Sequence, residues 1–467
     1  MKKYIVMLAM LGLAAVSGLT YSIHKILNQK DAVKIDYEVL EGNPAAAEGI
    51  TFHVRNQWNG KLHWDSQVVL GDDGEIESIV TEFENRFKEP TEENARNYSI
   101  SREKVNLYLN YVGIGGGNTW ISARGCETAV CTNLLDTCAA ETKPGETNTQ
   151  VVQLNHYQPY YSIDLFLNLN EGSYYTVGSE WEVWDNFLKI EIPDSHQLEV
   201  TVQKNEKGEI IMQQCNVIYG LEAFEISSVQ TANSVYFTFY GVDTEGQPYD
   251  LDIECGNGVF CIPLEPVSEK EKSKYFSSET IIYYNKVQNV LPLSETGCYP
   301  LELVADEEEQ MLYLLAREHE QAVLRIFDMK TMEERQKLKL TEYASYGIEH
   351  QIDIRKDGIV VFLSDSSFCY LEENNGALEK KVVARLGEGP RPSDGKYCYD
   401  LIYREDKAIL LIAEYENGST EAYIYVLGEK GVEYKAHFMP SFAYETYHGG
   451  TNWIHLRKED PLEITIE

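Results

Sequence analysis

Two short segments near the ends of the chain carry side chains suited to proton transfer or ligand contact. His63, Trp64 and Asp65 are consecutive, and His448 and Trp453 lie five residues apart near the C-terminus. A histidine beside a carboxylate can relay protons or bind a metal, and an indole offers a flat apolar face. We predict that His63, Trp64, His448 and Trp453 bind a ligand if the two ends of the chain meet. Separate surface histidines are the alternative.

A third candidate segment lies in the middle of the chain, from Glu180 to Asp185, where three carboxylates surround two indoles. Paired carboxylates can perform acid–base chemistry on a glycosidic bond while indoles stack on the sugar. In a strand, however, Glu182 and Trp184 share one face and Trp181 lies on the other. We therefore keep Trp181, Glu182 and Trp184 as ligand-binding candidates, and packing at a strand edge is the alternative.

Motifs that mark common catalytic and cofactor sites are absent from the sequence. It contains no G-x-S-x-G, no H-E-x-x-H and no C-x-x-C. The glycine-dense stretch 113–117 is not followed by the Lys-Ser/Thr pair that a phosphate-binding loop needs. We predict no catalytic residue, no metal and no cofactor.

The nine cysteines are spread over a long chain and do not form a compact disulfide framework. Cys126, Cys131 and Cys138 cluster in one polar segment, and their spacing matches no common zinc site. Cys255 and Cys261 flank a predicted turn. Disulfides within these two groups and free thiols are the two alternatives.

The charge balance excludes one class of partner. The chain has 75 acidic and 40 basic residues, which gives a net charge of −35. Nucleic-acid binding needs a basic surface, so we predict no nucleic-acid partner. Solubility is the simplest role for the excess of acidic residues.

The N-terminal segment predicts export. Residues 4–23 carry no charge and no proline, and they follow Lys2 and Lys3. As a helix this run would rise about 30 Å, the thickness of a bilayer core, with the lysines on the cytoplasmic side. We predict a signal anchor or a cleaved signal peptide over residues 1–30, followed by a polar lead-out over 31–49. The rest of the chain is then extracytoplasmic, held at the cell membrane through residues 4–23, or secreted if the leader is cleaved.

The last third of the chain contains an internal repeat. Apolar runs that begin at Met311, Ile359 and Ala408 are 48 and 49 residues apart. Each unit predicts four strands, at 301–304, 311–315, 322–327 and 336–340, at 351–354, 359–363, 368–371 and 381–384, and at 399–403, 408–412, 422–426 and 432–435. Four short strands in such a period are typical of propeller blades. A weaker copy covers residues 224–262.

These units resemble the blades of bacterial extracytoplasmic β-propellers of the TolB-like or WD40-like kind, over about residues 220–440. The resemblance is one of strand pattern, since the Trp-Asp pair that ends a WD40 blade is missing from these units. It implies an all-β, propeller-like domain of about 6–8 four-stranded blades over residues 50–467, and no active site. In export signal, acidity and composition the chain is also similar to membrane-anchored proteins of Gram-positive bacteria.

Three local predictions can be tested against a structure. The charged run 268–274 is either a loop between blades or a linker, which would place a domain boundary near 266–276 between an N-terminal β-rich domain and a propeller or sandwich. Lys34–Val39 is predicted to be a strand that pairs with the last blade. Glu75–Phe87 has apolar residues at helical spacing and predicts a helix, with a strand after the Asp73-Gly74 turn as the alternative.

The sequence favours a binding function. Propellers gather loops at one end, where they contact partners. We predict a membrane-tethered sensor or scaffold module for a protein, peptide or glycan, without catalysis. An exported carbohydrate-active hydrolase or lyase and a structural subunit of an envelope complex are the alternatives.

Overall fold

The computed structural model describes residues 2–27, 33–58, 62–85, 104–109, 127–156, 159–161, 163–169, 173–178, 187–249, 251–253, 256–293, 298–342, 350–356, 358–387, 397–416, 419–445, 451–454 and 463–467. Strands predominate over helices in these ranges. Two compact units make up the chain, unit 1 (residues 1–101 and 355–467) and unit 2 (residues 102–354). Each is described by itself.

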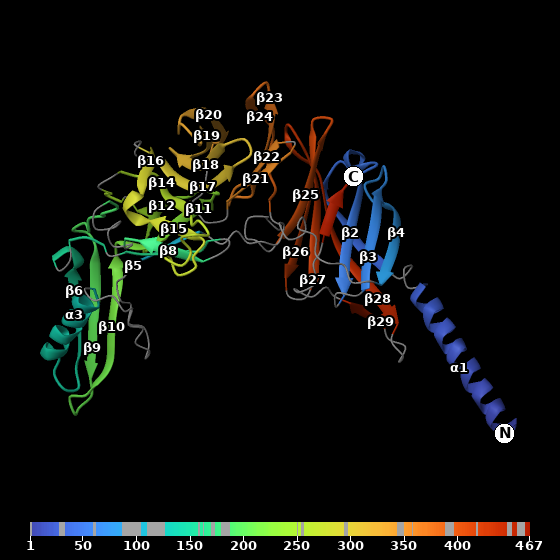
Figure 1. The fold of residues 1–467 in the computed structure, drawn as a ribbon, viewed down its shortest axis with the longest axis horizontal. Coiled ribbons are helices and arrows are strands. Elements are labelled where there is room, and N and C mark those ends of the chain that lie inside the picture. The colour runs from blue at the N-terminus through green and yellow to red at the C-terminus, as the bar shows by residue number, and fades with distance from the viewer. Residues whose placement is uncertain are drawn as a thin grey trace. The chain divides into compact units, whose positions relative to one another are not determined.

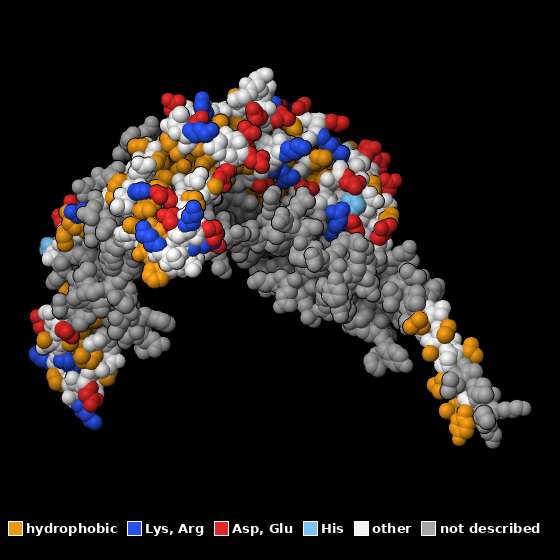
Figure 2. All heavy atoms as spheres, viewed as in Figure 1, with side chains coloured by type: hydrophobic (Ala, Val, Ile, Leu, Met, Phe, Trp, Pro, Cys, Tyr) orange, Lys and Arg blue, Asp and Glu red, His pale blue; other side chains and the backbone are white. Residues whose placement is uncertain are grey.

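The predicted apolar N-terminal segment is a helix, α1 (Lys2–Leu27). Its described apolar side chains are exposed, among them Leu13 at 68% and Leu19 at 66%. Figure 2 shows hydrophobic side chains along this helix. Among the residues that the structure describes, no helix has both the length and the apolar character needed to cross a membrane.

All twelve strands of the predicted repeat are present, and they form three antiparallel four-stranded units. The first sheet has the order β17 (Cys298–Asp306), β18 (Met311–Glu318), β19 (Gln321–Asp328), β20 (Glu334–Thr341). The second has the order β21 (Gln351–Arg355), β22 (Gly358–Phe362), β23 (Ser367–Asn374), β24 (Ala377–Arg385). The third contains β25 (Tyr397–Arg404), β26 (Lys407–Glu416), β27 (Ser419–Gly428) and β28 (Gly431–Glu445). The chain is thus mostly β with propeller-like blades, as predicted.

The second strand of each repeat is the most deeply buried, as its apolar sequence requires. Leu312 and Leu314 of β18, Val360 of β22, and Leu410 and Leu411 of β26 all have no exposed surface. A strand covered on both faces is apolar at consecutive positions instead of every second one. This double burial produces the periodicity that the sequence shows.

Both ends of unit 1 contribute strands to shared sheets (Figure 1). β1 (Val33–Gly42) pairs antiparallel with β28, with Tyr37 opposite Phe438, which confirms the predicted pairing of Lys34–Val39 with the last blade. β30 (Glu463–Ile466) in turn pairs with β2 (Thr51–Trp58), and the sheet continues through β3 (Leu62–Leu70) and β4 (Ile76–Asn85). β29 (Thr451–Ile454) pairs with β28.

The predicted helix over Glu75–Phe87 is wrong, because β4 occupies this segment. Helical spacing would put Ile79 and Val80 on one apolar face, whereas in the strand they point to opposite sides and Val80 is 56% exposed. The turn at Gly74, whose φ is +74°, sends the chain back along β3, which satisfies the backbone of β4. Pairing with β3 therefore outweighs a coincidental helical spacing.

Apolar side chains hold the sheets of unit 1 face to face. Phe52 of β2 contacts Phe438 of β28 with a ring-centroid distance of 5.1 Å, inside a cluster that also contains Val68 and Ile424. A second cluster joins β22–β24 to β25–β27. Face-to-face packing of successive four-stranded sheets is the blade arrangement of propellers.

The described residues of unit 2 form further β sheets and one α helix. A three-stranded sheet has the order β10 (Ile210–Tyr219), β9 (Gln197–Lys204), β6 (Thr147–Gln153), and α3 (Glu127–Glu141) packs against it. A larger sheet has the order β11 (Leu221–Gln230), β12 (Ser234–Asp243), β14 (Gly258–Pro266), β15 (Thr280–Tyr283), β8 (Tyr174–Val177), with β13 (Pro248–Tyr249) and β16 (Gln288–Pro292) beside it. β5 (Val105–Leu109) pairs with β7 (Ile163–Leu167), and short 3-10 helices lie at Leu154–His156 and Tyr284–Lys286. A further 3-10 helix, Pro44–Ala47, belongs to unit 1.

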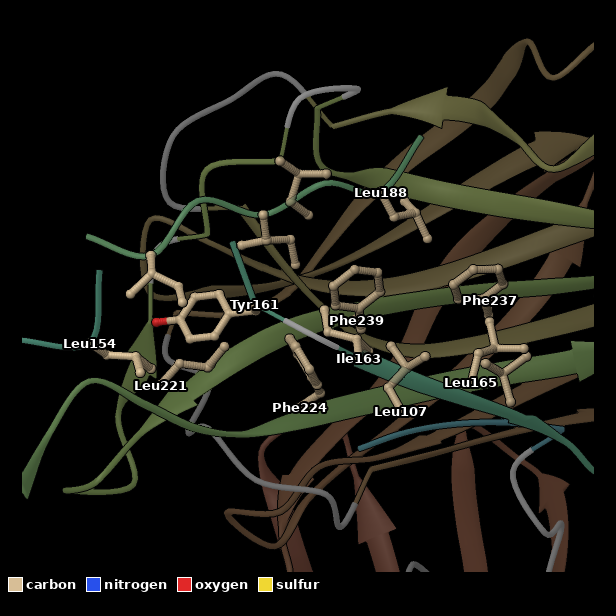
Figure 3. Close-up of a cluster of buried hydrophobic side chains, with 14 of the residues drawn as sticks. Leu107, Leu154, Tyr161, Ile163, Leu165, Leu188, Leu221, Phe224, Phe237 and Phe239 are labelled. Atoms are coloured by element: carbon tan, nitrogen blue, oxygen red, sulfur yellow. The ribbon is translucent and has the colours of Figure 1, made fainter. Parts of the chain in front are cut away.

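A large apolar cluster lies in the core of unit 2. Phe224, Phe237 and Phe239, from β11 and β12, pack with Ile163 and Leu165 of β7 (Figure 3). The Phe224 and Phe239 rings meet edge-on, with centroids 5.4 Å apart. The sheet of β11 and β12 therefore packs against β5 and β7 through this cluster.

Candidate functional site

The predicted His-Trp-Asp segment lies in β3, next to a polar cluster on the outer face of the β30-β2-β3-β4 sheet. His53 of β2 is held between two carboxylates, with Nδ1 2.8 Å from Asp65 Oδ1 and Nε2 3.1 Å from Glu467 Oε1. Arg55 Nε donates to Asp65 Oδ2 at 2.7 Å, and Arg55 Nη1 contacts Thr465 Oγ1 at 3.4 Å. Asp65 is therefore the member of the predicted segment that enters a defined network.

The charges around Asp65 keep it ionised. Partial burial opposes ionisation, but the hydrogen bonds from Arg55 and His53 outweigh it and hold the pKa of Asp65 below its usual range. Both ring nitrogens of His53 are engaged with carboxylates. These contacts connect β30 and Glu467 to β2 and β3, so the cluster stabilises the sheet.

The remaining predicted ligand-binding residues are placed only in part. His63 and Trp64 lie in β3 opposite Gln57 and Asn56, and Trp453 lies in β29 opposite Ala443. Trp181, Glu182, Trp184 and His448 are outside the described residues. Within the described ranges, no group of three or more His, Cys, Asp or Glu residues is arranged to hold a metal ion.

One cysteine of each predicted disulfide group has a described side chain, and both of these side chains are free thiols. Cys138 and Cys261 are free and buried. Cys138 packs under the sheet of β9, with Sγ 3.6 Å from the Asn148 carbonyl oxygen, and Cys261 points into a core cluster from β14. Burial raises the pKa of both thiols. Cys126 and Cys255 lie outside the described residues, as does the side chain of Cys131.

A surface that sequence reasoning missed lies in unit 2, between β8 and the loop that joins β14 to β15. It consists of Tyr175, Tyr275 and Phe276, which we call the aromatic platform. The Tyr175 ring stacks on Phe276, with centroids 5.9 Å apart and planes 24° apart, and meets Tyr275 at 5.5 Å and 54°. Phe276 is 82% exposed, so most of its ring faces water.

The backbone that presents Phe276 is in an unfavourable conformation. Phe276 has φ +55° and Ser277 has φ +64°, in the left-handed region that aromatic residues rarely adopt. Hydrogen bonds within the loop fix this shape, from Ser277 N to the Lys272 oxygen at 2.7 Å and from Ser278 N to the Tyr275 oxygen at 2.9 Å. Such conformations persist where the surroundings enforce them, often at binding sites.

Parallel pairing of β8 with β15 brings the platform together. Tyr175 pairs with Ile281 in this ladder, and Glu279 N donates to the Ser173 oxygen at 2.8 Å. The side chain of Tyr175 thus reaches the loop that carries Tyr275 and Phe276, about a hundred positions later in the chain.

Charges at the edge of the platform are balanced. Lys274 Nζ lies 4.9 Å from the centroid of the Tyr275 ring, and its hydrogen bond with Tyr275 raises the pKa of Lys274. Lys272 pairs with Glu269 at 2.7 Å. Figure 2 likewise shows Lys and Arg side chains interspersed with Asp and Glu on the described surface. The platform is thus an apolar aromatic surface in a nearly neutral setting.

The loop that carries Tyr275 and Phe276 includes the charged run 268–274, for which a loop and a linker were the two predicted alternatives. Residues 267–279 join β14 to β15, two strands that pair antiparallel with each other. The sequence signal that could have indicated a site is the adjacent Tyr275 and Phe276 inside a run of charged and small residues. An aromatic side chain in a polar loop either packs into the core or faces water, where it can contact a ligand. Phe276 faces water.

Comparisons with known proteins give similarities to solved structures only. No family model matches the sequence, and no curated protein matches it. Among solved structures the chain is similar to a putative 6-phosphogluconolactonase from Bacteroides fragilis, with 10% identity, a TM-score of 0.27, and coverage of 90% of this chain and 98% of that one. It is similar to AztD from Citrobacter koseri with 10% identity, a TM-score of 0.24 and coverage of 90% and 98%. It is similar to the Dos1 propeller with 7% identity, a TM-score of 0.23 and coverage of 59% and 70%. TM-scores this low carry no argument about function.

Proposed function

We propose that this chain is an extracytoplasmic binding module whose aromatic platform takes a neutral oligosaccharide. The observation that carries the proposal is Phe276, whose ring is 82% exposed, stacked on Tyr175 and held by a left-handed backbone. A large apolar ring in water and an unfavourable φ both cost free energy, and a bound ligand would offset that cost.

The chemistry of the platform favours a sugar over other flat or apolar ligands. The negative face of an aromatic ring attracts the positively polarised C–H groups on one side of a pyranose ring. The net charge of −35 disfavours a nucleotide or another phosphate-bearing ligand. The balanced charges of Lys272 and Glu269 at the rim give no reason to expect a charged glycan.

The N-terminal helix supports a location outside the cytoplasm. α1 is 26 residues long, begins with two lysines, and exposes its described apolar side chains. We propose that it acts as the export signal or membrane tether and holds the binding module at the cell surface. Pulse labelling of the expressed chain, followed by cell fractionation, tests this proposal. Full-length chain in the cytoplasmic soluble fraction would contradict it.

Binding is tested by isothermal titration of the full-length protein with cellohexaose, chitohexaose and maltohexaose, in a detergent without a sugar headgroup. The wild-type protein is expected to bind at least one of these neutral oligosaccharides. Phe276→Ala and Tyr175→Ala are each expected to weaken that binding at least about tenfold, which corresponds to about 1.4 kcal/mol, because each removes one ring of the stack. The expected stoichiometry is one oligosaccharide per chain.

Phe166→Ala provides the matched control, because Phe166 of β7 is also aromatic and 51% exposed but lies outside the platform. Its binding should equal that of the wild type. Failure of all three oligosaccharides to bind, or undiminished binding by Phe276→Ala, would refute the proposal. Shortening of the bound oligosaccharide during incubation would instead favour the carbohydrate-active hydrolase or lyase.

A further inference from the structure

The sheet face that carries Tyr175 of the aromatic platform continues across two more strands. Glu265 of β14, Ile281 of β15 and Tyr175 of β8 are consecutive partners in the strand pairing. Leu264 and Ile282, each next to one of them in sequence, belong to the core cluster of unit 2. Because side chains alternate along a strand, the row from Glu265 to Tyr175 faces away from that core.

A second cluster of side chains lies on the same face. Tyr283 follows Ile281 by two residues in β15, so it points to the same side of the sheet. Lys286 Nζ lies 3.8 Å from the centroid of the Tyr283 ring, and Lys286 forms an ion pair with Glu265. The side chains of Lys286 and Glu265 are each 47% exposed, so a ligand can reach both. We call Tyr283, Lys286 and Glu265 the polar end.

The surrounding structure holds the polar end in place. The 3-10 helix Tyr284–Lys286 follows β15 directly, and Tyr284 is buried in the core cluster of unit 2. Lys286 then has two contacts at once, one with the Tyr283 ring and one with the Glu265 carboxylate. A lysine that is already held in one position loses less conformational entropy when it binds a ligand. The polar end is therefore preorganised for contact.

The polar end and the aromatic platform are close enough for one ligand to contact both. Tyr283 pairs with Val177 of β8, two residues after Tyr175, which corresponds to roughly 7 Å along the strand. The pKa of Lys274 is raised first by its hydrogen bond with Tyr275, and the charge of Tyr283 also raises it. Lys274 is therefore within electrostatic reach of an aromatic residue of each cluster.

The chemistry of the polar end suits the hydroxyl groups of a neutral sugar. An ammonium group has several N–H donors and a carboxylate has two acceptor oxygens, so the ion pair leaves bonding capacity on both groups. A hydroxyl both donates and accepts, and neighbouring hydroxyls can bond to Lys286 and Glu265 together. A charged ligand would instead compete with one member of the pair for the other. The polar end therefore favours a neutral ligand, as the aromatic platform does.

We propose that the site takes two sugar units of one neutral glycan, one stacked on the aromatic platform and another bonded to Lys286 and Glu265. This inference rests on the proposed function, since it requires that the platform bind an oligosaccharide. Stacking selects weakly among sugars, because it needs only an apolar ring face. Hydrogen bonds to hydroxyls depend on where those hydroxyls lie, so the polar end determines which oligosaccharide is preferred.

Isothermal titration of the full-length protein with the hexasaccharide that binds best among cellohexaose, chitohexaose and maltohexaose tests the inference. Lys286→Met and Glu265→Met are each expected to weaken binding at least about tenfold, because each removes a hydrogen bond to a charged group. Exposed ion pairs contribute little to stability, so both variants should fold. Lys339→Met is the matched control, because Lys339 of β20 pairs with Glu342 and its side chain is 42% exposed. Its binding should equal that of the wild type.

Hydrogen exchange of the unbound variants separates a direct contact from a change in the platform. The amides of residues 267–279 should exchange as in the wild type, and faster exchange there would mean that the substitutions act through the shape of the loop, which would overturn the inference. Equal weakening by Lys339→Met would also overturn it.

The outcomes distinguish this inference from the proposed function. Binding that Phe276→Ala weakens, but that Lys286→Met and Glu265→Met leave unchanged, would overturn the polar end alone and keep the platform. Absence of binding by the wild type would refute both.

Discussion

A chain of two phenol hydroxyls links the N-terminal strand of unit 1 to its last blade and allows a directional prediction. The hydroxyls of Tyr37 in β1 and Tyr434 in β28 are hydrogen-bonded to each other, and the Tyr434 hydroxyl also bonds the carbonyl oxygen of Gly74. A carbonyl can only accept, so Tyr434 donates to Gly74 and Tyr37 donates to Tyr434. Burial raises the pKa of both tyrosines, which keeps both donors protonated.

This direction makes the two Tyr→Phe substitutions unequal. Tyr434 has no exposed surface. Tyr434→Phe leaves both the Gly74 carbonyl and the Tyr37 hydroxyl without their partner, which should cost about 1–3 kcal/mol. Tyr37→Phe removes one donor, while Tyr434 still donates to Gly74, so the expected cost is about 0.5–1.5 kcal/mol. In the Tyr434→Phe background, Tyr37→Phe should cost nothing further, because the Tyr37 hydroxyl has already lost its acceptor.

Native-state hydrogen exchange of the β1 and β28 amides measures these costs locally, which avoids treating a chain of two units as a single two-state transition. The comparison needs wild type, both single variants and the double variant. Tyr434→Phe should accelerate local opening about tenfold or more relative to wild type, and Tyr37→Phe should do so less. Equal effects, or a larger effect of Tyr37→Phe, would refute the assigned donor direction. Additive effects in the double variant would show that the hydroxyls act independently.

Three further predictions concern other parts of the fold. Ile464→Ala in β30, whose side chain is 2% exposed in the core under β2, should cost about 2–5 kcal/mol in local opening of β2, and Ile464→Val should cost less. Burial lowers the pKa of His196 from 6.5 to about 4, so unit 2 should keep full stability above pH 6.5 and lose about 3 kcal/mol as the pH falls towards 4. In His196→Asn, the free energy of unfolding by urea should fall less between pH 6.5 and pH 4 than it does in the wild type. Burial raises the pKa of the Cys369 thiol to about 12, so Cys138, Cys261 and Cys369 should resist iodoacetamide until the protein is unfolded, as followed by mass spectrometry.

Burial on both faces explains why the repeat could be predicted from the sequence. Ala408–Ile412 is apolar at every position because its two faces lie in two different core clusters, one with Ile409 and Leu411 and the other with Ala408, Leu410 and Ile412. That pattern requires no knowledge of distant residues. Alternation of polar and apolar residues predicts a strand at Lys34–Val39, and its pairing with the last blade was predicted because the strands at the two ends of a propeller meet.

Partners distant in sequence explain where prediction failed. The segment of β4 has helical spacing in its sequence, and only its pairing with β3 makes it a strand. The sequence offered His63 as the histidine that acts with Asp65, whereas in the structure Asp65 contacts His53 of the neighbouring strand. The other ring nitrogen of His53 contacts Glu467, from the far end of the chain. No local pattern contains that information, because register between strands decides which side chains meet.

The aromatic platform extends this argument from contacts to function. Tyr175 would be one more half-buried strand tyrosine if β8 did not pair with β15 beside the loop of Phe276. The adjacent Tyr275 and Phe276 are visible in the sequence, but their contact with Tyr175 depends on the parallel pairing of β8 with β15, about a hundred positions apart. A surface assembled in this way cannot be recognised before the strand pairing is known.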